Sequence, residues 1–131
     1  MKLTLLVALV AFAGQVFAFD AAKEWKTNCA TCHSIGGGDK GKVGPDLAGV
    51  SKRRKLDWIV KFMKYPEGMI NGDEEEAGYE KPDPIAKKVY NLYKPTVMAD
   101  QELDKAQIQA LLKFIDSKGK KPQGKILKAL K

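Results

Sequence analysis

Histidine and cysteine are scarce in this chain of 131 residues, which has one histidine and two cysteines. A structural zinc site needs four ligands, usually cysteine or histidine, so these three residues are too few to complete one. Runs in which β-branched and polar residues alternate are almost absent, so the sequence has little strand signal. A long hydrophobic run occurs only at the N-terminus. These absences argue against a zinc domain and a β-rich fold, and favour an all-α protein.

The N-terminal residues 1–18 read MKLTLLVALVAFAGQVFA, with a cation at Lys2, an apolar run over Leu3–Ala13 and a small residue at Ala18. This order is typical of a cleaved secretory signal peptide. An uncleaved anchor is the alternative, but the apolar stretch is shorter than the about 20 residues that span a bilayer. We therefore predict cleavage after Ala18 and export of the chain from Phe19 onward, with the bacterial periplasm as its destination.

After residue 18, the sequence is predicted to form one small domain, residues 19–119, followed by a lysine-rich tail, residues 120–131. Four segments have helical periodicity or caps, and a glycine-rich loop over residues 36–49 separates the first two. Asp20 is the expected N-cap of the first helix, and the second helix has the apolar stripe Leu56, Ile59, Val60 and Met63 and ends at Pro66. The third helix is expected to begin with the cap Asp83 before Pro84 and to carry Ile85, Val89, Leu92 and Tyr93. The last helix is expected to begin with a capping box of Asp104 and Gln107, to carry the stripe Ile108, Leu111, Leu112 and Ile115, and to end at Gly119. Residues between Pro66 and Asp83 are expected to form loops.

The cysteines and the histidine lie together in the motif CATCH, as Cys29, Cys32 and His33. A disulfide between the two thiols is permitted in an exported protein, but it would close a very small loop. A thioredoxin-like pair belongs between a strand and a helix, whereas the segment before Cys29 is predicted to be helical. Covalent haem attachment uses all three residues: two thioethers to the haem and an imidazole ligand to its iron. The motif therefore predicts a covalently bound haem.

A haem iron with one histidine ligand needs a sixth ligand or keeps an open site. Methionine is the natural candidate, since its thioether is a neutral, soft ligand that favours ferrous iron. Met63 lies on the apolar stripe of a predicted helix and is expected to fill the core. Met69 lies in the predicted loop YPEGMING and stays a candidate. Met98, in the irregular segment before the last helix, is favoured by its position.

The sequence resembles the class I, monohaem cytochromes c along nearly all of its length after residue 18. The resemblance rests on CATCH, GKVGPDLAGV, LDWIVKFMKYPEGM and the VM that precedes the last helix. It implies a small all-α fold of about four helices around one covalent haem c, with crossing terminal helices. It further implies His33 and Met98 as axial ligands of the iron and the Pro45 carbonyl as acceptor for the imidazole. Arg53, Arg54 and Trp58 match the region that contacts haem propionates. The family usually has proline after the methionine ligand, where this chain has Ala99.

The predicted function follows from the ligands. With His33 and Met98 both bound, the iron has no position for a substrate, which describes an electron carrier and not an enzyme. The alternatives are a haem subunit of a larger oxidoreductase, or a sensor with an open iron site if Met98 does not ligate.

The formal charge of +7 is unevenly distributed. Six lysines crowd the end of the chain and five acidic residues gather near its middle: Lys118, Lys120, Lys121, Lys125, Lys128 and Lys131, against Asp73, Glu74, Glu75, Glu76 and Glu80. Both runs could be merely solvated, but the lysines also suit steering toward an acidic redox partner. Nucleic acid is a poor candidate partner for an exported haem protein. Contact with a membrane would need the short apolar face of Ile126, Leu127 and Leu130. We expect the haem pocket to end at Gly119, so that the tail is dispensable for it.

Overall fold

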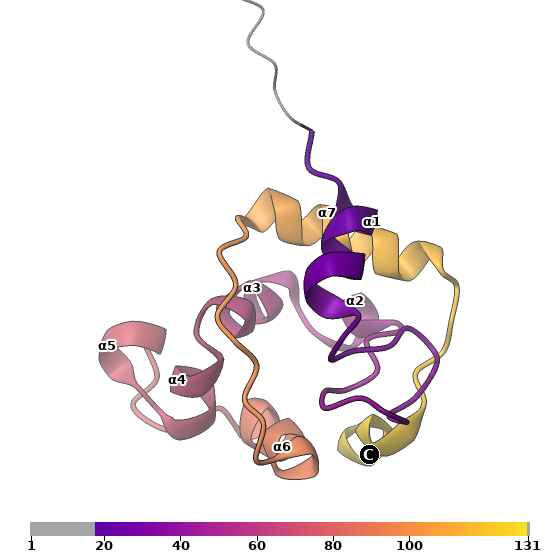
Figure 1. Cartoon of the computed structure of the whole chain (residues 1–131). Coiled ribbons are helices and arrows are strands. Elements are labelled where there is room, and N and C mark those ends of the chain that lie inside the picture. Colours follow the sequence, from indigo (N-terminus) through magenta and orange to yellow (C-terminus); the bar gives the residue numbers. More distant parts are fainter. Residues whose placement is uncertain (1–17, 131) are drawn as a thin grey trace, which may run out of the picture.

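The computed structural model describes residues 18–130, and the predicted signal peptide lies almost wholly outside them. This part of the chain is helical and contains no strand, apart from one isolated bridge between Asp73 and Tyr79. None of its helices is long and apolar enough to cross a membrane. The elements are α1 (Ala21–Glu24), the π-helical turn η1 (Trp25–Cys29), α2 (Val50–Arg53), α3 (Leu56–Lys64), α4 (Pro66–Asn71), α5 (Glu74–Ala77), α6 (Pro84–Tyr93), α7 (Lys105–Ser117) and the 3-10 helix η2 (Gly124–Ala129) (Figure 1).

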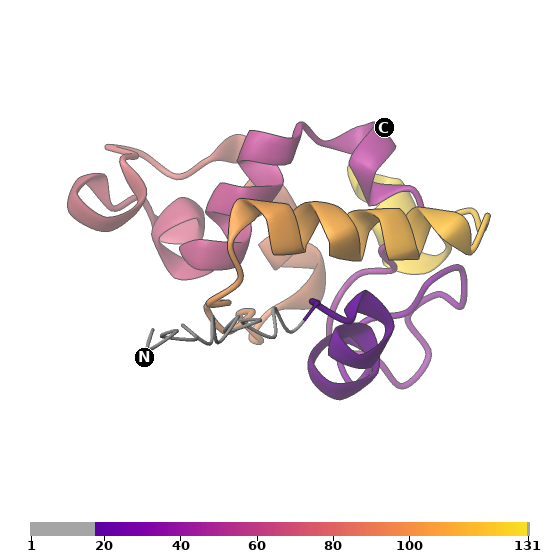
Figure 2. The ribbon, with the colours of Figure 1, turned by 90° about the horizontal axis from the view of Figure 1, so that it is seen from above.

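The two ends of the domain cross each other, as expected. Helix α7 packs across α1 (Figures 1 and 2). The rings of Trp25 and Phe114 meet there, with centroids 6.5 Å apart. The inner face of α7 is the predicted stripe, whose four residues are all buried: Ile108, Leu111, Leu112 and Ile115.

The predicted N-caps are confirmed at three helices. Asp20 accepts hydrogen bonds from the first turn of α1, and Asp83 accepts from Ile85 and Ala86 of α6. Asp104 and Gln107 form the predicted capping box of α7. Each cap satisfies backbone N–H groups that have no partner inside the helix, which explains why these starts are legible in the sequence.

The segment SKRRKLDWIVKFMKYP, residues 51–66, which carries the predicted stripe of Leu56, Ile59, Val60 and Met63, does not form one continuous helix. It forms as α2 and α3, separated by Arg54 and Lys55 in extended conformations. The charged run SKRRK offers no apolar stripe that would hold it to the core as one helix with LDWIVKFMK. Proline at position 66 ends α3, as predicted, but it also begins α4, because a residue at the first helical position needs no N–H donor.

Residues 67–82 are therefore not simply loops. Helix α4 includes Met69, and the acidic run forms the short helix α5, whose N-cap Asp73 accepts a hydrogen bond from Glu76 N at 3.0 Å. Acidic side chains suit the first turn of a helix because the N-terminal end of the helix dipole is positive. In α6 the buried face also differs from the expectation: Ile85 is 36% exposed, whereas Ala86 is buried.

Two clusters of buried side chains hold the fold together. One joins α3 to α7 through Ile59, Ile108 and Leu112. The other joins α4, α5 and α6 through Met69, Ile70, Ala77 and Ala86. Helix α5 lies at one end of the molecule and the C-terminal segment at the other (Figures 1 and 2). The space between the clusters and η1 holds the candidate site.

Candidate haem site

A cavity of about 370 Å³ lies at the centre of the molecule. Its wall is built from α2, α3, α4, α6, α7, η1 and η2, and from the loops that follow η1 and α6. The lining is mostly apolar, with side chains such as Leu47, Ile59, Phe62, Val89 and Leu111. The residues that the CATCH motif and the family resemblance assign to the site all line this cavity: Cys29, Cys32, His33, Pro45, Arg53, Arg54, Trp58 and Met98.

The π-helical turn η1 presents Cys29 at one wall of the cavity. The chain then turns tightly, with the amides of Cys32 and His33 donating to Cys29 O at 3.1 and 2.9 Å. This turn brings all three residues of the motif to one side of the cavity, and both thiols are free. Burial, together with the charges of Glu24 and Cys32, raises the pKa of Cys29 to about 11. The thiol is therefore protonated at neutral pH, which is unlike the low-pKa thiolates that exchange disulfides.

His33 is held by the loop that follows it in the sequence. Its Nδ1 lies 2.8 Å from Pro45 O, so the Nδ1–H donates to that carbonyl. The lone pair of the neutral ring then lies on Nε2, where it is free to bind a metal ion. Burial lowers the pKa of His33. The imidazole is therefore neutral, which is the state that binds a metal ion.

Gly44 lets this loop approach the ring. A side-chain carbon at position 44 would lie only 2.6 Å from His33 Cε1 and 2.9 Å from Nδ1. The amide of Gly44 also donates to Cys32 O at 2.9 Å, which ties the loop to the motif. Close packing therefore favours glycine here, since a larger residue would force the loop or the imidazole to shift.

Asp46 organises the glycine-rich loop, and the sequence analysis did not single it out. Its side chain is fully buried and accepts hydrogen bonds from Gly36 N, Gly38 N and Ala48 N at 2.8 to 2.9 Å. Burial opposes its ionisation, but the backbone donors outweigh burial and keep the pKa of Asp46 below its usual value. A loop rich in glycine has many N–H groups without regular partners. The need of these N–H groups for an acceptor is the one sequence signal that could have identified Asp46.

Met98 lies on the irregular segment between α6 and α7, and it is half-buried in the cavity wall. The segment is fastened by Gln101, whose amide donates to Met63 O of α3 at 2.7 Å and whose side chain donates to Ala99 O at 2.8 Å. These bonds restrain the segment at the place where Ala99 stands instead of proline.

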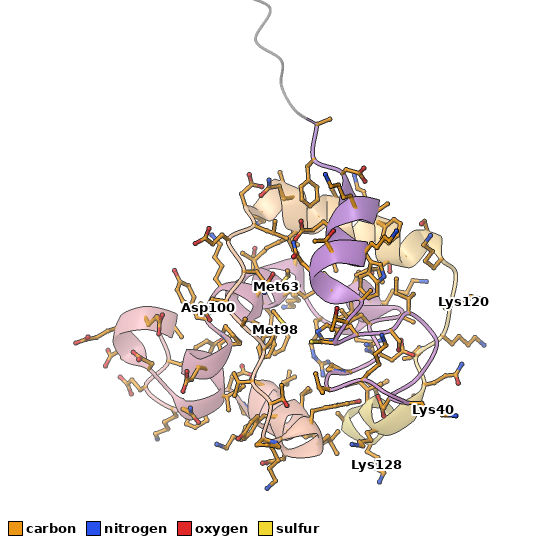
Figure 3. The ribbon with its side chains drawn as sticks, in the orientation of Figure 1. Lys40, Met63, Met98, Asp100, Lys120 and Lys128 are labelled. Carbon is orange, nitrogen blue, oxygen red and sulfur yellow. The ribbon has the colours of Figure 1, made fainter. Side chains whose placement is uncertain are left out.

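Met63 packs against the cluster of α3 and α7, as predicted for a core residue, but Met63 and Met69 differ from the expectation in their relation to the cavity. Met63 lines the cavity together with Met98, and both lie near the middle of the molecule (Figure 3). Met69 does not line it, and its fully buried side chain belongs to the cluster of α4, α5 and α6. Among the alternatives to Met98, Met63 is therefore the one that the geometry places at the site.

The three residues expected near the haem propionates differ in their free donors. Arg53 donates to the backbone carbonyls of Asp46 and Ala48, so its guanidinium is used by the loop. The Arg54 guanidinium lies over the Trp58 ring, 5.6 Å from its centroid. Among the described residues, Trp58 Nε1 is the buried side-chain donor that has no hydrogen-bond partner. A buried N–H without a partner costs free energy, so this indole nitrogen is the best-placed donor for a carboxylate in the cavity.

The C-terminal segment also contributes to the cavity, contrary to our expectation that the pocket ends at Gly119. Ile126 of η2 is 4% exposed and lines the wall. Gln123 N donates to Asp46 Oδ2 at 3.2 Å, across 77 residues of sequence. The expectation was wrong because a lysine-rich segment is expected to be solvated. The burial of Ile126, the apolar residue of this segment that faces the cavity, depends on the tertiary fold and cannot be read from the sequence.

These features fit a covalent haem. The two thiols and the neutral imidazole share one wall, a thioether lies on the chain segment Thr96–Gln101, the lining is apolar, and an unpartnered N–H is available for a carboxylate. No cluster of three or more histidine, cysteine, aspartate or glutamate side chains that would bind a bare metal ion occurs among the described residues. When haem is bound, its iron supplies a one-electron redox couple.

Comparison with known proteins agrees with this site. Residues 19–118 match the sequence model of the cytochrome c family, described as "Cytochrome c". The structure is similar to the cytochrome c domain of a protein from Pseudomonas putida, with a TM-score of 0.52 and 26% identity over 73% of this chain and 84% of that one. It is also similar to a cytochrome c from Rhodothermus marinus, with a TM-score of 0.54 and 28% identity over 75% of each chain. The chain therefore belongs to the cytochrome c family, as an electron-transfer haem protein that binds haem c covalently.

Proposed function

We propose that this protein is a periplasmic carrier of single electrons, in which His33 and Met98 are the two axial ligands of the haem iron. The observation that carries the proposal is their placement: an imidazole from the CATCH motif and a thioether from a distant segment line one apolar cavity. Both are neutral ligands, and a thioether favours the ferrous state and raises the potential.

The surroundings of His33 suit this role. Burial keeps the ring neutral, and its hydrogen bond to Pro45 O makes it a stronger ligand while fixing its orientation. Once both axial positions are filled, the iron has no site for a substrate or a gas. Exchange of one electron with a protein partner is then the remaining reaction, and the apolar wall limits the response of water to the change in charge.

The absorption spectrum tests the ligation. We expect a low-spin ferric spectrum with the weak near-infrared band of a methionine–iron bond. A high-spin spectrum would instead favour the open-site sensor. A haem subunit of a larger oxidoreductase would show the same band, and it is distinguished by stable co-purification with a catalytic chain.

The proposed location rests on residues 1–18, whose order of charge, apolar run and small residue is that of a secretory signal. Cytochrome c domains are usually exported, which supports the same location. Fractionation of cells that express the full chain should recover the haem protein with the periplasmic contents, and recovery with the membranes would favour an uncleaved anchor.

The proposed partners are redox proteins with an acidic docking surface. The acidic helix α5 and the basic C-terminal segment lie at opposite ends of the molecule (Figures 1 and 2). Lys40, Lys120 and Lys128 are exposed at the basic end and point outward (Figure 3). The ion pair found among the described residues, Lys105 with Asp57 at 2.7 Å, leaves these lysines available to a partner. Such a charge separation orients a molecule during diffusional encounter.

A further inference from the structure

The C-terminal segment, residues 120–130, extends past the part of the chain that matches the family, which ends at residue 118. It turns back from the end of α7 and places η2 beside α6 (Figure 1). We propose that this segment closes the haem cavity and positions the loop that holds His33, so that it helps to set the reduction potential.

The first support is the packing of Ile126. The C-terminal segment carries three large apolar residues, Ile126 and Leu127 in η2 and Leu130 directly after it, and two of them face solvent: Leu127 is 44% and Leu130 is 39% exposed. Ile126 is 4% exposed and lines the same cavity as Cys32, His33 and Pro45. The segment therefore directs one specific side chain into the wall of the site, which a solvated tail would not do.

The second support is a chain of hydrogen bonds from the segment to the histidine. Gln123 N donates to Asp46 Oδ2 at 3.2 Å, and Gln123 Nε2 donates to Gly36 O at 2.7 Å. The residue before Asp46 is Pro45, whose carbonyl accepts the His33 ring N–H at 2.8 Å. The segment thus supplies one of the donors that fix Asp46, and Asp46 fixes the backbone that orients His33.

The third support is a second anchor at Asp39 of the glycine-rich loop. One of its carboxylate oxygens accepts from Tyr93 Oη of α6 at 2.8 Å, and the other accepts from Lys125 N. Gly124 permits this approach: its φ is +84°, and a side-chain carbon there would lie within 3 Å of the Asp39 carboxylate. Loop, helix and C-terminal segment are therefore joined at a built contact, which pins η2 over the cavity.

The consequence concerns water. Without Ile126 the cavity wall is open on this side, and without Gln123 N the carboxylate of Asp46 loses one donor. Water that enters a haem cavity stabilises the more highly charged ferric state, so the potential falls. A looser Pro45 also weakens the bond that orients His33. Gln123 and Ile126 act through Asp46 and the cavity wall, and are positioning residues.

The test compares Ile126→Ala with Leu127→Ala, a matched change on the same helix at an exposed position, in the full-length holoprotein. We expect Ile126→Ala to lower the reduction potential and to speed hydrogen exchange of the His33 Nδ1–H several-fold in the ferrous protein. Leu127→Ala should leave the potential and the exchange rate unchanged, and the conservative variant Ile126→Val should keep both close to their wild-type values. Gly124→Ala, which detaches the segment at its other anchor, should shift both readouts in the direction of Ile126→Ala.

Two results would overturn the proposal. One is a potential and a ring-proton exchange rate that do not move in Ile126→Ala, even if the melting temperature falls, because that describes a purely structural contact. The other is equal shifts in Ile126→Ala and Leu127→Ala. The proposal rests on haem in this cavity and not on electron delivery to a partner, and both readouts use the isolated protein. Its failure would therefore leave the proposed carrier function intact.

Discussion

The carbonyl oxygen of Pro45 lies 2.8 Å from Nδ1 of His33, and the backbone of Gly44 fills the space beside the same ring. These two contacts bring a loop residue 12 positions away against the motif histidine. The ring can rotate only if this loop moves, so the orientation of the proposed iron ligand is decided by the loop.

Gly44→Ala should disturb this contact. The added carbon would lie 2.6 Å from His33 Cε1, so the loop or the ring must shift. We expect the free energy of unfolding of the holoprotein to fall by about 1–3 kcal/mol, as for other overpacked sites. Denaturant unfolding measures this change. Gly37→Ala is the control, since its new carbon meets Ser34 Cβ at an ordinary 3.4 Å. Equal losses in both variants would contradict a specific role for Gly44.

Alanine substitutions of the three methionines should have different effects on the haem absorption spectrum. Met98→Ala should remove the near-infrared thioether band, give a high-spin or water-ligated ferric haem and lower the potential, because a neutral ligand that favours ferrous iron is lost. Met63→Ala should keep the band. Met69→Ala should also keep it, but should lower stability by about 2–5 kcal/mol, since this side chain is fully buried away from the cavity. Loss of the band in Met63→Ala with its retention in Met98→Ala would reassign the ligand to Met63.

Asp46 should make stability depend on acid pH. Its pKa is lower in the folded protein than in the unfolded chain, where an aspartate has a pKa of about 3.9. The carboxylate therefore stabilises the fold fully above about pH 4, and this contribution is lost as the pH falls through the folded-state pKa.

Asp46→Asn should cost about 2 kcal/mol at pH 7, because charged acceptors for several N–H donors are replaced by one neutral oxygen. It should also flatten the decline in stability below about pH 4, as measured by unfolding at a series of pH values. Asp57→Asn, at an exposed ion pair, is the control and should change stability little. An unchanged acid limb in Asp46→Asn would show that other carboxylates govern it.

The cysteines should carry the haem covalently. In the wild-type protein, acid–acetone extraction should leave the colour with the polypeptide, and the mass should equal one haem plus a chain that begins near Phe19. Changing Cys29 and Cys32 together to Ala should abolish the holoprotein, because no thiol remains to form a thioether. Haem that extracts from the wild type, or a mass equal to a bare disulfide-bonded chain, would refute covalent attachment.

The lysines of the C-terminal segment should be tested by substitution and not by truncation, because truncation would also remove Ile126 from the cavity wall. Lys121→Gln with Lys128→Gln should slow reduction by the native partner several-fold at low ionic strength. The difference should vanish as salt approaches about 1 M, where the screening length is roughly 3 Å. The same charge change at the exposed Lys55 and Lys81 is the control. If both pairs of substitutions slow reduction equally, the rate depends on the net charge of the protein and not on the lysines of the C-terminal segment.

Several features of this protein were readable from the sequence because their physical causes are local. The caps Asp20, Asp83 and Asp104 bond to amides two or three residues away, so the helix starts were predicted correctly. The buried stripe of α7 follows from helical periodicity alone. The spacing of Cys29, Cys32 and His33 specifies covalent haem, since the three groups act on one cofactor from a single turn.

Other features depend on contacts between distant segments, and only the tertiary structure decided them. Met63 and Met69 are six residues apart on neighbouring helices, yet α3 turns one into the cavity and α4 turns the other into the core. Asp46 draws donors from residues 36 and 38 and from residue 123, which no local pattern reveals. The charged C-terminal segment has weak apolar periodicity, but Asp39 and Asp46 hold it where Ile126 fills the wall. Burial of one side chain against a cavity is a property of the assembled fold, because the surfaces that bury it come from every part of the chain.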